Sequence, residues 1–200
     1  MPRPVDPERH RARRLQIIDA GLTAFSRHGY AGATTAVICR TAGVGSGTLF
    51  HYFPTKDSLL VAILELGTTE TREFFAAQEG RDDSREVLLD YVRHAVADLR
   101  DERAAGFIAA VGGVVSNELV ATALRADEEA IREGLTTWTE RAQSGGQIRT
   151  DLSARQVADW IALLLDGFAD RITAQGEFDA DRETPLLLEL TELLLDGRGS

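Results

Sequence analysis

Four side chains that form strong hydrogen bonds lie within nine residues of one another. Thr48, His51, Tyr52 and Lys56 supply a hydroxyl, an imidazole, a phenol and an ammonium. No carboxylate interrupts this run before Asp57. In proteins that bind nucleic acids, side chains of these types donate to phosphate oxygens and reach base edges. The residue types therefore point to recognition of a polyanion, if the surrounding elements hold them on one surface.

The elements around these residues are two short helices joined by a glycine-containing turn. The apolar spacing predicts helices over residues 35–42 and 46–53. Thr34 or Thr35 can cap the first helix, and Gly43 ends it. This spacing of two helices around a short turn is typical of a helix-turn-helix.

The second of these helices has an apolar side and a polar side. At about 100° per residue, Leu49 and Phe53 fall together and are expected to pack inward. The outward side carries Gly47, Thr48, His51 and Tyr52. Glycine on this side lets the backbone approach a groove closely. Such a helix fits the major groove of DNA, where short polar side chains reach the base edges.

Two further residues on either side of this helix suit a phosphate group. Lys56 lies in the first turn after Pro54, where helix amides and an ammonium favour an anion. Thr35, at the start of the preceding helix, can donate to the DNA backbone in the same way. Double-stranded DNA is therefore the expected partner.

Charge is distributed unevenly along the 200 residues. The formal net charge is −10, which by itself argues against DNA as a partner. However, residues 1–60 hold eight basic and four acidic residues, whereas the remainder holds 14 and 28. A basic N-terminal part followed by an acidic remainder indicates that one end of the protein faces a polyanion. A basic tail that only solvates the protein would give the same count.

Composition also limits the compartment and the cofactors. No apolar run approaches the roughly 18 residues that a membrane helix needs, and no apolar segment of a signal peptide follows the basic N-terminus. The single cysteine, Cys39, excludes an internal disulfide and a multi-cysteine metal site. We therefore expect a cytoplasmic protein without a membrane partner, a metal or another cofactor.

Helical periodicity continues through the rest of the chain, and no alternating strand pattern interrupts it. The sequence therefore predicts an all-α fold. Asp83 and Glu86 resemble a capping box, Ser153 and Gln156 fit one, and Pro185 suits a first helical turn. The small residues of "AAGFIAAVGGVVS" should let a helix approach its neighbours closely.

Leucines cover most of the circumference of the last helix, so it must be buried on two sides. The second side is either the centre of the protein's own core or another subunit. Acidic residues at 189, 192 and 196 favour the subunit. We predict a symmetric homodimer formed with the helix at 153–174. The predicted interface residues are Ile161, Leu164, Leu165, Phe168, Leu187, Leu190 and Leu194.

The segment "TTAVICRTAGVGSGTLFHYFPTKDSLL" resembles the DNA-binding signature of TetR-family transcriptional repressors. "GGQIRTDLSARQVADWIALLLDGF" is similar to the penultimate helix of that family. The resemblance implies an N-terminal three-helix DNA-binding domain with a helix-turn-helix, over residues 1–54. It also implies a larger C-terminal helical domain over residues 55–200, which dimerises and binds a small-molecule effector that releases the DNA.

The family pattern assigns roles to the DNA-binding residues. It implies phosphate contacts for Thr35, Tyr52 and Lys56, and base contacts for Gly47, Thr48 and His51. Ser46 also falls within the set, at a position where lysine is common.

Three residues depart from the family pattern, and each lacks a polar group that is common at its position. Gly45 stands where a capping serine is common, Ser46 lacks the ammonium of the usual lysine, and Phe50 lacks the hydroxyl of the usual tyrosine. The arginines at positions 9, 11, 13 and 14 can compensate along the backbone or in the minor groove. A solvated tail is the alternative.

The effector residues are less well defined by the sequence. Large side chains from separate helices can line an apolar cavity for a small, apolar molecule. They also fit an ordinary core. The candidates are Tyr91, Phe107, Val111, Leu135 and Trp138.

The sequence lacks the motifs of the two enzyme classes that it superficially suggests, nucleotide-binding enzymes and hydrolases. "GVGSG" (43–47) lacks the G-K-[ST] ending of a phosphate loop and follows a helix instead of a strand, and there is no G-x-S-x-G. We therefore expect no enzyme. The expected function is a ligand-responsive repressor that binds a palindromic operator as a dimer. A helical carrier module without DNA binding is the alternative.

Overall fold

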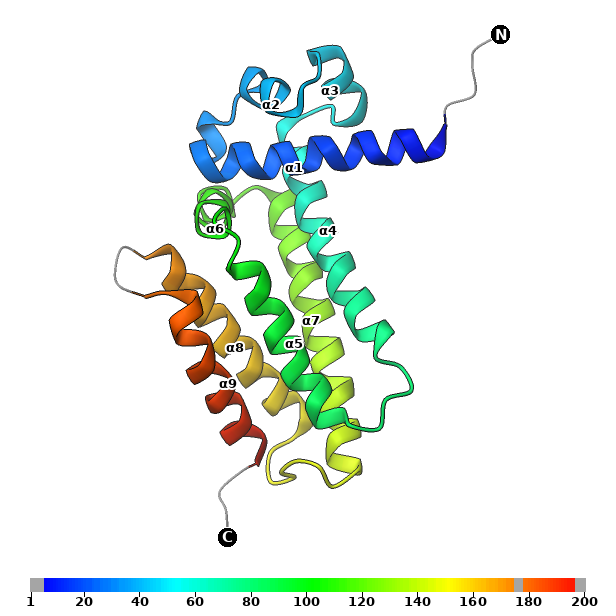
Figure 1. Cartoon of the computed structure of the whole chain (residues 1–200), viewed down its shortest axis with the longest axis vertical. Helices are drawn as coiled ribbons and strands as arrows, with labels where there is room; N and C mark the ends of the chain where they lie inside the picture. The colour runs from blue at the N-terminus through cyan, green and yellow to red at the C-terminus, as the bar shows by residue number, and fades with distance from the viewer. Residues whose placement is uncertain (1–5, 175–177, 197–200) are drawn as a thin grey trace. The chain divides into compact units, whose positions relative to one another are not determined.

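The computed structural model describes residues 6–174 and 178–196. Over these ranges the protein has nine helices and no strand (Figure 1), so the predicted all-α fold is confirmed. The helices are α1 (Pro7–Gly32), α2 (Thr35–Ala42), α3 (Ser46–Tyr52), α4 (Lys56–Ala77), α5 (Ser84–Leu99), α6 (Ala104–Gly112), α7 (Glu118–Ser144), α8 (Ala154–Thr173) and α9 (Ala180–Asp196). In this described part, no helix is long and apolar enough to span a membrane.

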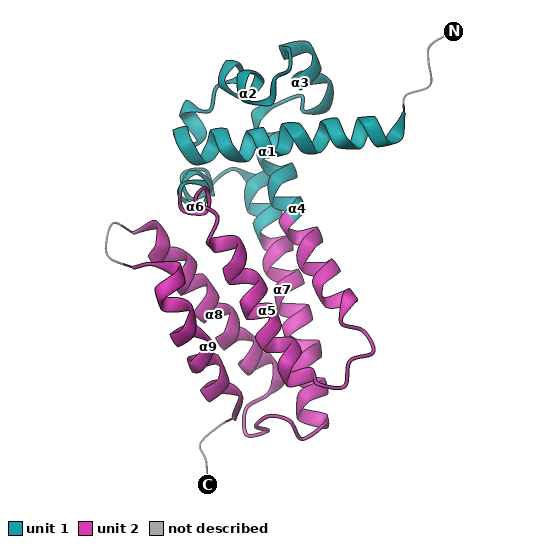
Figure 2. Ribbon diagram, in the orientation of Figure 1, with its two compact units in different colours: residues 1–66, 106–124 teal, residues 67–105, 125–200 magenta. Residues whose placement is uncertain are grey.

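The chain divides into two compact units (Figure 2). The first comprises residues 1–66 and 106–124, and the second comprises residues 67–105 and 125–200. Helices α4 and α7 each contribute residues to both units. The predicted domain boundary after residue 54 stays a prediction. The ends of the predicted domains, residues 1–5 and 197–200, lie outside the described residues.

The first unit is built around the apolar face of α1. Ile17 and Phe25 on this helix are completely buried. Ile38 of α2, Leu49 of α3 and Leu59 of α4 belong to the same core cluster. Because each helix contributes a buried side chain, α2 and α3 are held in a fixed orientation against α1.

Local backbone chemistry sets where α2 and α3 begin and end. Of the two candidate caps, Thr34 caps α2, and its hydroxyl accepts a hydrogen bond from the amide of Val37 at 3.3 Å. Gly43 ends α2 with φ at +63°, a conformation that costs glycine little. Gly45 occupies the N-cap position of α3 without a side-chain bond. The start of α3 therefore depends on backbone hydrogen bonds alone.

A small residue brings two helices of the first unit into close contact, as predicted. A Cβ atom on Gly106 of α6 would lie 2.3 Å from the carbonyl oxygen of Ser26 of α1. No side chain larger than hydrogen fits there without a backbone shift. In the second unit, Gly134 of α7 plays the same part, because the ring of Phe75 of α4 occupies the space of its missing Cβ.

In the second unit, α5, α8 and α9 pack against one another, and α8 and α9 run antiparallel (Figure 1). The predicted capping box at the start of α8 is confirmed. The hydroxyl of Ser153 accepts from the amide of Gln156 at 3.2 Å, and the side chain of Gln156 accepts from the amide of Ser153 at 3.0 Å.

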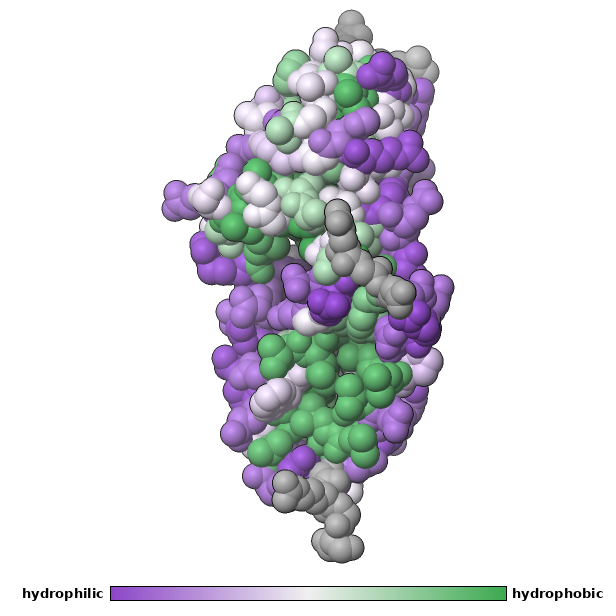
Figure 3. All heavy atoms as spheres, turned by 90° about the vertical axis from the view of Figure 1, so that its left-hand side faces the viewer, coloured by the Kyte–Doolittle hydropathy of each residue, from purple (hydrophilic) through white to green (hydrophobic). Residues whose placement is uncertain are grey.

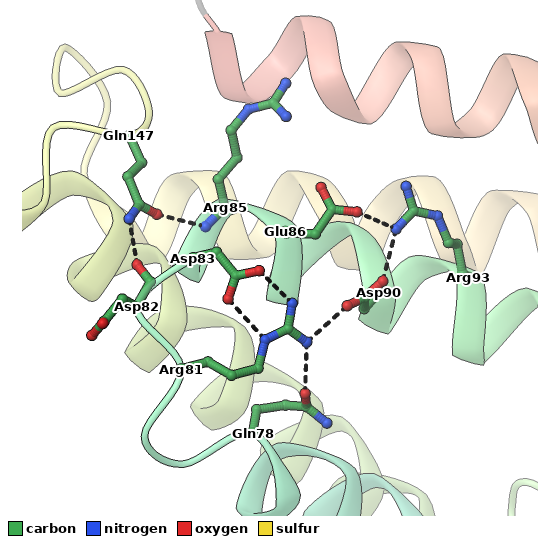
Figure 4. A network of polar contacts seen from close by, with 9 residues as sticks. All are labelled: Gln78, Arg81, Asp82, Asp83, Arg85, Glu86, Asp90, Arg93 and Gln147. Carbon is green, nitrogen blue, oxygen red and sulfur yellow. Dashed lines mark hydrogen bonds and ion pairs between the residues drawn. The ribbon is translucent and has the colours of Figure 1, made fainter.

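The predicted capping-box pair at the start of α5 is wrong. Asp83 occupies the N-cap position but makes no side-chain capping bond. Its carboxylate instead accepts two hydrogen bonds from Arg81, at 2.7 and 2.8 Å (Figure 4). These bonds hold the pKa of Asp83 below its ordinary value. Glu86 accepts from Arg93 at 2.6 Å. Charge-assisted bonds to guanidinium groups have displaced the weaker capping bonds.

The same polar network closes the turn between α4 and α5 (Figure 4). Arg81 also donates to Gln78 at 2.8 Å and to Asp90 at 2.9 Å. From the loop after α7, the side chain of Gln147 accepts from the amide of Arg85 at 2.9 Å. This turn is therefore fixed by side chains on both of its ends.

The sequence predicted that Pro185 lies in a first helical turn, and this prediction is wrong. Helix α9 begins at Ala180 and has Pro185 inside it. The reason is Asp179, whose carboxylate accepts from the amide of Arg182 at 2.9 Å and caps the helix. The helix therefore starts earlier than the proline alone indicates.

Candidate nucleic-acid interface

The outward side of α3 presents the predicted base-contacting residues. Gly47, Thr48 and His51 are exposed, whereas Leu49 and Phe53 are each only 4% exposed. The expected inward packing of these two apolar residues is confirmed. The buried pair anchors the helix, and the opposite side meets solvent.

A groove of about 970 Å³ runs between α3 and the start of α1. From α3 it is lined by Gly47, Thr48, His51 and Tyr52. From the start of α1 it is lined by Asp6, Arg9, His10 and Arg13. The structure therefore brings four of the predicted DNA-binding residues together with two of the N-terminal arginines.

His10 was not among the predicted site residues, yet it lies close to two of them. Its ring centroid is 4.6 Å from that of Tyr52 and 6.3 Å from that of His51. The rings of His51 and Tyr52 are 5.3 Å apart. Arg9, His10 and Arg13 share one face of α1 at helical spacing, and this spacing is the signal in the sequence that marks His10.

Lys56 is half-buried and already has partners within the protein. Its ammonium donates to the carbonyl oxygen of Tyr30 at 2.6 Å and lies 4.1 Å from the centroid of the Tyr30 ring. The Tyr30 hydroxyl donates to Asp57, which also accepts from the side-chain amide of Asn117 at 2.9 Å. Burial and then the hydrogen bond to Asp57 raise the pKa of Tyr30 to about 12.

The remaining predicted DNA-binding residues lie outside the lining of the groove. Thr35 is the first residue of α2 and is half-buried, and Ser46 is the first residue of α3 and is exposed. Their contacts to DNA, like that of Lys56, stay predictions.

The five predicted effector residues belong to two different core clusters. Tyr91, Leu135 and Trp138 are buried in the core of the second unit. Phe107 and Val111 belong to the core of the first unit. Spacing along separate helices does not reveal this division, because it depends on which helices pack together. The ring of Phe75, which helical spacing did not single out, stacks on that of Tyr91 at a centroid distance of 4.6 Å.

The seven predicted interface residues differ in exposure. Ile161, Leu165, Phe168 and Leu187 are buried in the protein's own core, and Leu164 and Leu194 are half-buried. Only Leu190 among the seven is well exposed, at 42%. The sequence could not separate the two sides of these helices, because leucine occupies both.

Leu190 and four large apolar side chains outside the predicted set form a broad exposed patch over α8 and α9 (Figure 3). We call this patch the α8–α9 face. It comprises Trp160, Leu163, Leu186, Leu190 and Leu193, which are between 42% and 60% exposed. Exposed apolar patches of this kind mark interaction surfaces.

Within residues 6–174 and 178–196, no group of three histidine, cysteine or acidic residues is placed to hold a metal ion. A short helix with an exposed polar side, preceded by a second helix and flanked by arginines, is the arrangement of a helix-turn-helix DNA-binding regulator.

Comparisons with known proteins show which regulators this chain resembles. The model of bacterial regulatory proteins of the tetR family matches residues 17–63. The HTH-type transcriptional repressor AcnR of Corynebacterium jeikeium is 27% identical over 162 residues, which cover 80% of this chain and 81% of the relative. Over its N-terminal part the chain is therefore similar to the DNA-binding region of TetR-family regulators, and over most of its length it is similar to a transcriptional repressor.

Solved structures share the fold. A TetR transcription regulator from Haloarcula marismortui has a TM-score of 0.79 at 19% identity, over 92% of this chain and 96% of that one. FadR of Bacillus subtilis, in complex with stearoyl-CoA, has a TM-score of 0.72 at 19% identity, over 92% of this chain and 99% of that one. These likenesses extend the shared fold through the helices of both units.

Proposed function

We propose that this protein is a ligand-responsive transcriptional repressor that binds a palindromic DNA operator as a homodimer. The observation that supports this most strongly is the exposed polar side of α3, with Gly47, Thr48 and His51 above the buried Leu49 and Phe53. A helix held in this way can lie in the major groove with its side chains against base edges.

The residues of the interface divide into two roles in this proposal. Thr48 and His51 contact base edges and set the preferred sequence, while Gly47 lets the backbone come close. Tyr52, Lys56 and Thr35 contact phosphates and hold the helix in place. Ser46 is exposed beside them at the first position of α3.

The second copy of the chain covers the α8–α9 face in this proposal. Large apolar side chains on two adjacent helices would bury a continuous apolar surface against the same surface of the partner, as a two-fold dimer requires. Two copies of α3 would then read two half-sites about 34 to 36 Å apart or a multiple of that distance.

Release from DNA follows from a small molecule bound among the helices of the second unit. FadR of Bacillus subtilis, which shares the fold, holds stearoyl-CoA. Tyr91, Leu135 and Trp138 are our candidates for the apolar surroundings of such a molecule. Helix α4 would transmit the change, because it carries Lys56 in its first turn and continues to Ala77. Reversing a 99:1 preference takes roughly a 10⁴-fold difference in ligand affinity between the two states.

Selection of bound duplexes from random DNA, near physiological salt, tests the proposal first. We expect enrichment of a palindrome whose half-sites have the spacing given above. A folded dimer that enriches no sequence, in the absence of a co-purified ligand, would favour a carrier module.

Two substitutions then test the division of roles on the selected duplex. His51→Ala should reduce discrimination between the operator and single-base variants by about 1–3 kcal/mol per affected pair. Lys56→Ala should weaken binding to all sequences about equally, because a phosphate contact carries no sequence information. Competition binding against a panel of single-base variants measures both. If both proteins bound like the parent, the placement of α3 in the major groove would be wrong.

A further inference from the structure

Helix α1 begins with turns that contribute nothing to the core. Residues 7–13 are all exposed, and the first completely buried side chain of α1 is that of Ile17. The start is nevertheless well formed, because Asp6 accepts from the amide of Glu8 at 3.1 Å and Pro7 occupies the first turn. A capped helical extension without apolar burial gains little from packing, so its surface side chains indicate its role.

The charges of this extension face two ways. Arg9 and Arg13, four residues apart, line the groove shared with α3, and His10 lines it between them. Arg11 is exposed but does not line it, because it lies about 200° around the helix from Arg9. Two of the arginines are therefore directed to the groove, and a third provides an equal charge elsewhere on the same turns.

The opposite wall of the groove suits an anion that also touches α3. It consists of Gly43, Val44 and Gly45 from the turn, followed by Gly47, Thr48, His51 and Tyr52 from α3. Among the described residues that line the groove, Asp6 is the one acid, and it already caps α1. The basic side of the groove is thus continuous with the residues that face the bases.

We propose that this groove holds one strand of the DNA backbone, and that Arg9, Arg13 and His10 contact its phosphates. The inference rests on the proposed function and assigns α1 a direct part in it. A free phosphate ion would need an enclosed site, whereas a groove of about 970 Å³ that runs along α3 fits a chain of phosphates.

His10 lies in the groove between the two arginines and close to α3. The groups that face it are Asp6, Arg9 and Arg13 from α1, and His51 and Tyr52 from α3. Its imidazole can donate a hydrogen bond to a phosphate oxygen of a strand that lies in the groove.

The salt dependence of operator binding tests the arginines. Each phosphate contact contributes about 0.9 to the slope of log K against log salt, and a dimer has two copies. Arg9→Ala and Arg13→Ala should each lower the slope by about 1.8, and the double variant by about 3.6. Arg11→Ala is the matched control and should leave the slope unchanged. Circular dichroism of each variant checks that α1 still folds.

The affinity for the operator at one pH and one salt concentration tests His10. His10→Ala should weaken binding by roughly threefold to tenfold, because a hydrogen bond to a phosphate is lost in each subunit. His28→Ala, on an exposed position of the same helix outside the groove, should bind like the parent. Unchanged binding by His10→Ala would overturn the part assigned to this histidine.

The outcomes separate this inference from the proposed function. Operator binding by the parent, with full slopes in Arg9→Ala and Arg13→Ala, would overturn only the role of the groove. If Arg11→Ala lowered the slope of log K against log salt as much as the groove variants do, the role of the groove would also be overturned, because net charge alone would then explain the change in slope. A parent that bound no duplex would overturn both.

Discussion

At the scale of single residues, Asp57 connects three helices of the first unit. It lies in the first turn of α4 and accepts hydrogen bonds from Tyr30 of α1 and from Asn117. The side-chain carbonyl oxygen of Asn117 in turn accepts from the amide of Leu119 at the start of α7. These polar contacts join residues far apart in the chain, so helical periodicity carries no signal for them. The inward position of Leu49, in contrast, followed from helical spacing alone.

The hydroxyl of Tyr30 gives this connection a dependence on alkaline pH. The raised pKa keeps the phenol protonated in the folded protein up to about pH 12, whereas an unfolded chain releases the proton near pH 10. The stability that the protonated phenol supplies is therefore complete below pH 10 and is lost as the pH rises through 12.

Tyr30→Phe should lower the free energy of unfolding by about 0.5–1.5 kcal/mol at pH 8, because the hydrogen bond to Asp57 is lost. The gap between parent and variant should close as the pH rises from 10 to 12. Urea unfolding of both proteins at pH 8 and pH 11 measures the gap. A gap of constant size would contradict the assignment of the raised pKa to this hydroxyl.

At the scale of elements, the contact between α6 and α1 depends on a missing side chain. Gly106→Ala would place a methyl group 2.3 Å from the carbonyl oxygen of Ser26, and one of the two backbones would have to move. We expect a loss of about 1–3 kcal/mol in the free energy of unfolding.

The control for this prediction lies on the same helix. No neighbouring helix or side chain comes within 4 Å of the position that a Cβ atom on Gly112 would take, so Gly112→Ala should be neutral or slightly stabilising. Denaturant unfolding compares the two variants under one condition. Equal stability of Gly106→Ala and Gly112→Ala would show that α6 and α1 separate readily.

Helical elements could be predicted from the sequence where periodicity and capping agree. The start of α8 at Ser153 is such a case, since its two capping bonds involve only neighbours in the chain. The capping bonds of α5 and the start of α9 were predicted wrongly, because Arg81 competes for Asp83 and because Asp179 caps ahead of Pro185. The apolar periodicity of a helix carries no signal from side chains outside the helix that bond or replace its capping residue.

At the scale of the whole molecule, the α8–α9 face should control assembly. Leu193 is 60% exposed on α9, and Leu193→Glu would place a charge in the middle of an apolar dimer interface. We expect the parent to be a dimer and this variant a monomer by sedimentation at micromolar concentration, with operator binding weakened in parallel.

A leucine of nearly equal exposure on another helix provides the comparison. Leu119 on α7 is 59% exposed, and Leu119→Glu should leave the dimer intact. A dimer that survived Leu193→Glu but not Leu119→Glu would place the interface elsewhere. The sequence predicted that these two apolar-rich helices form the interface, but most of the residues that it singled out lie in the core. Because leucines lie on every side of α9, their spacing does not show which side of the helix is buried.

The α8–α9 face also has a spectroscopic consequence. The chain has two tryptophans, of which Trp138 is 1% exposed in the core of the second unit and Trp160 is 53% exposed on the α8–α9 face. Emission from Trp138 therefore reports on the integrity of the core, and emission from Trp160 on whether that face meets water. A blue shift on concentration, without a change in helix content, would register subunit association in the unlabelled protein.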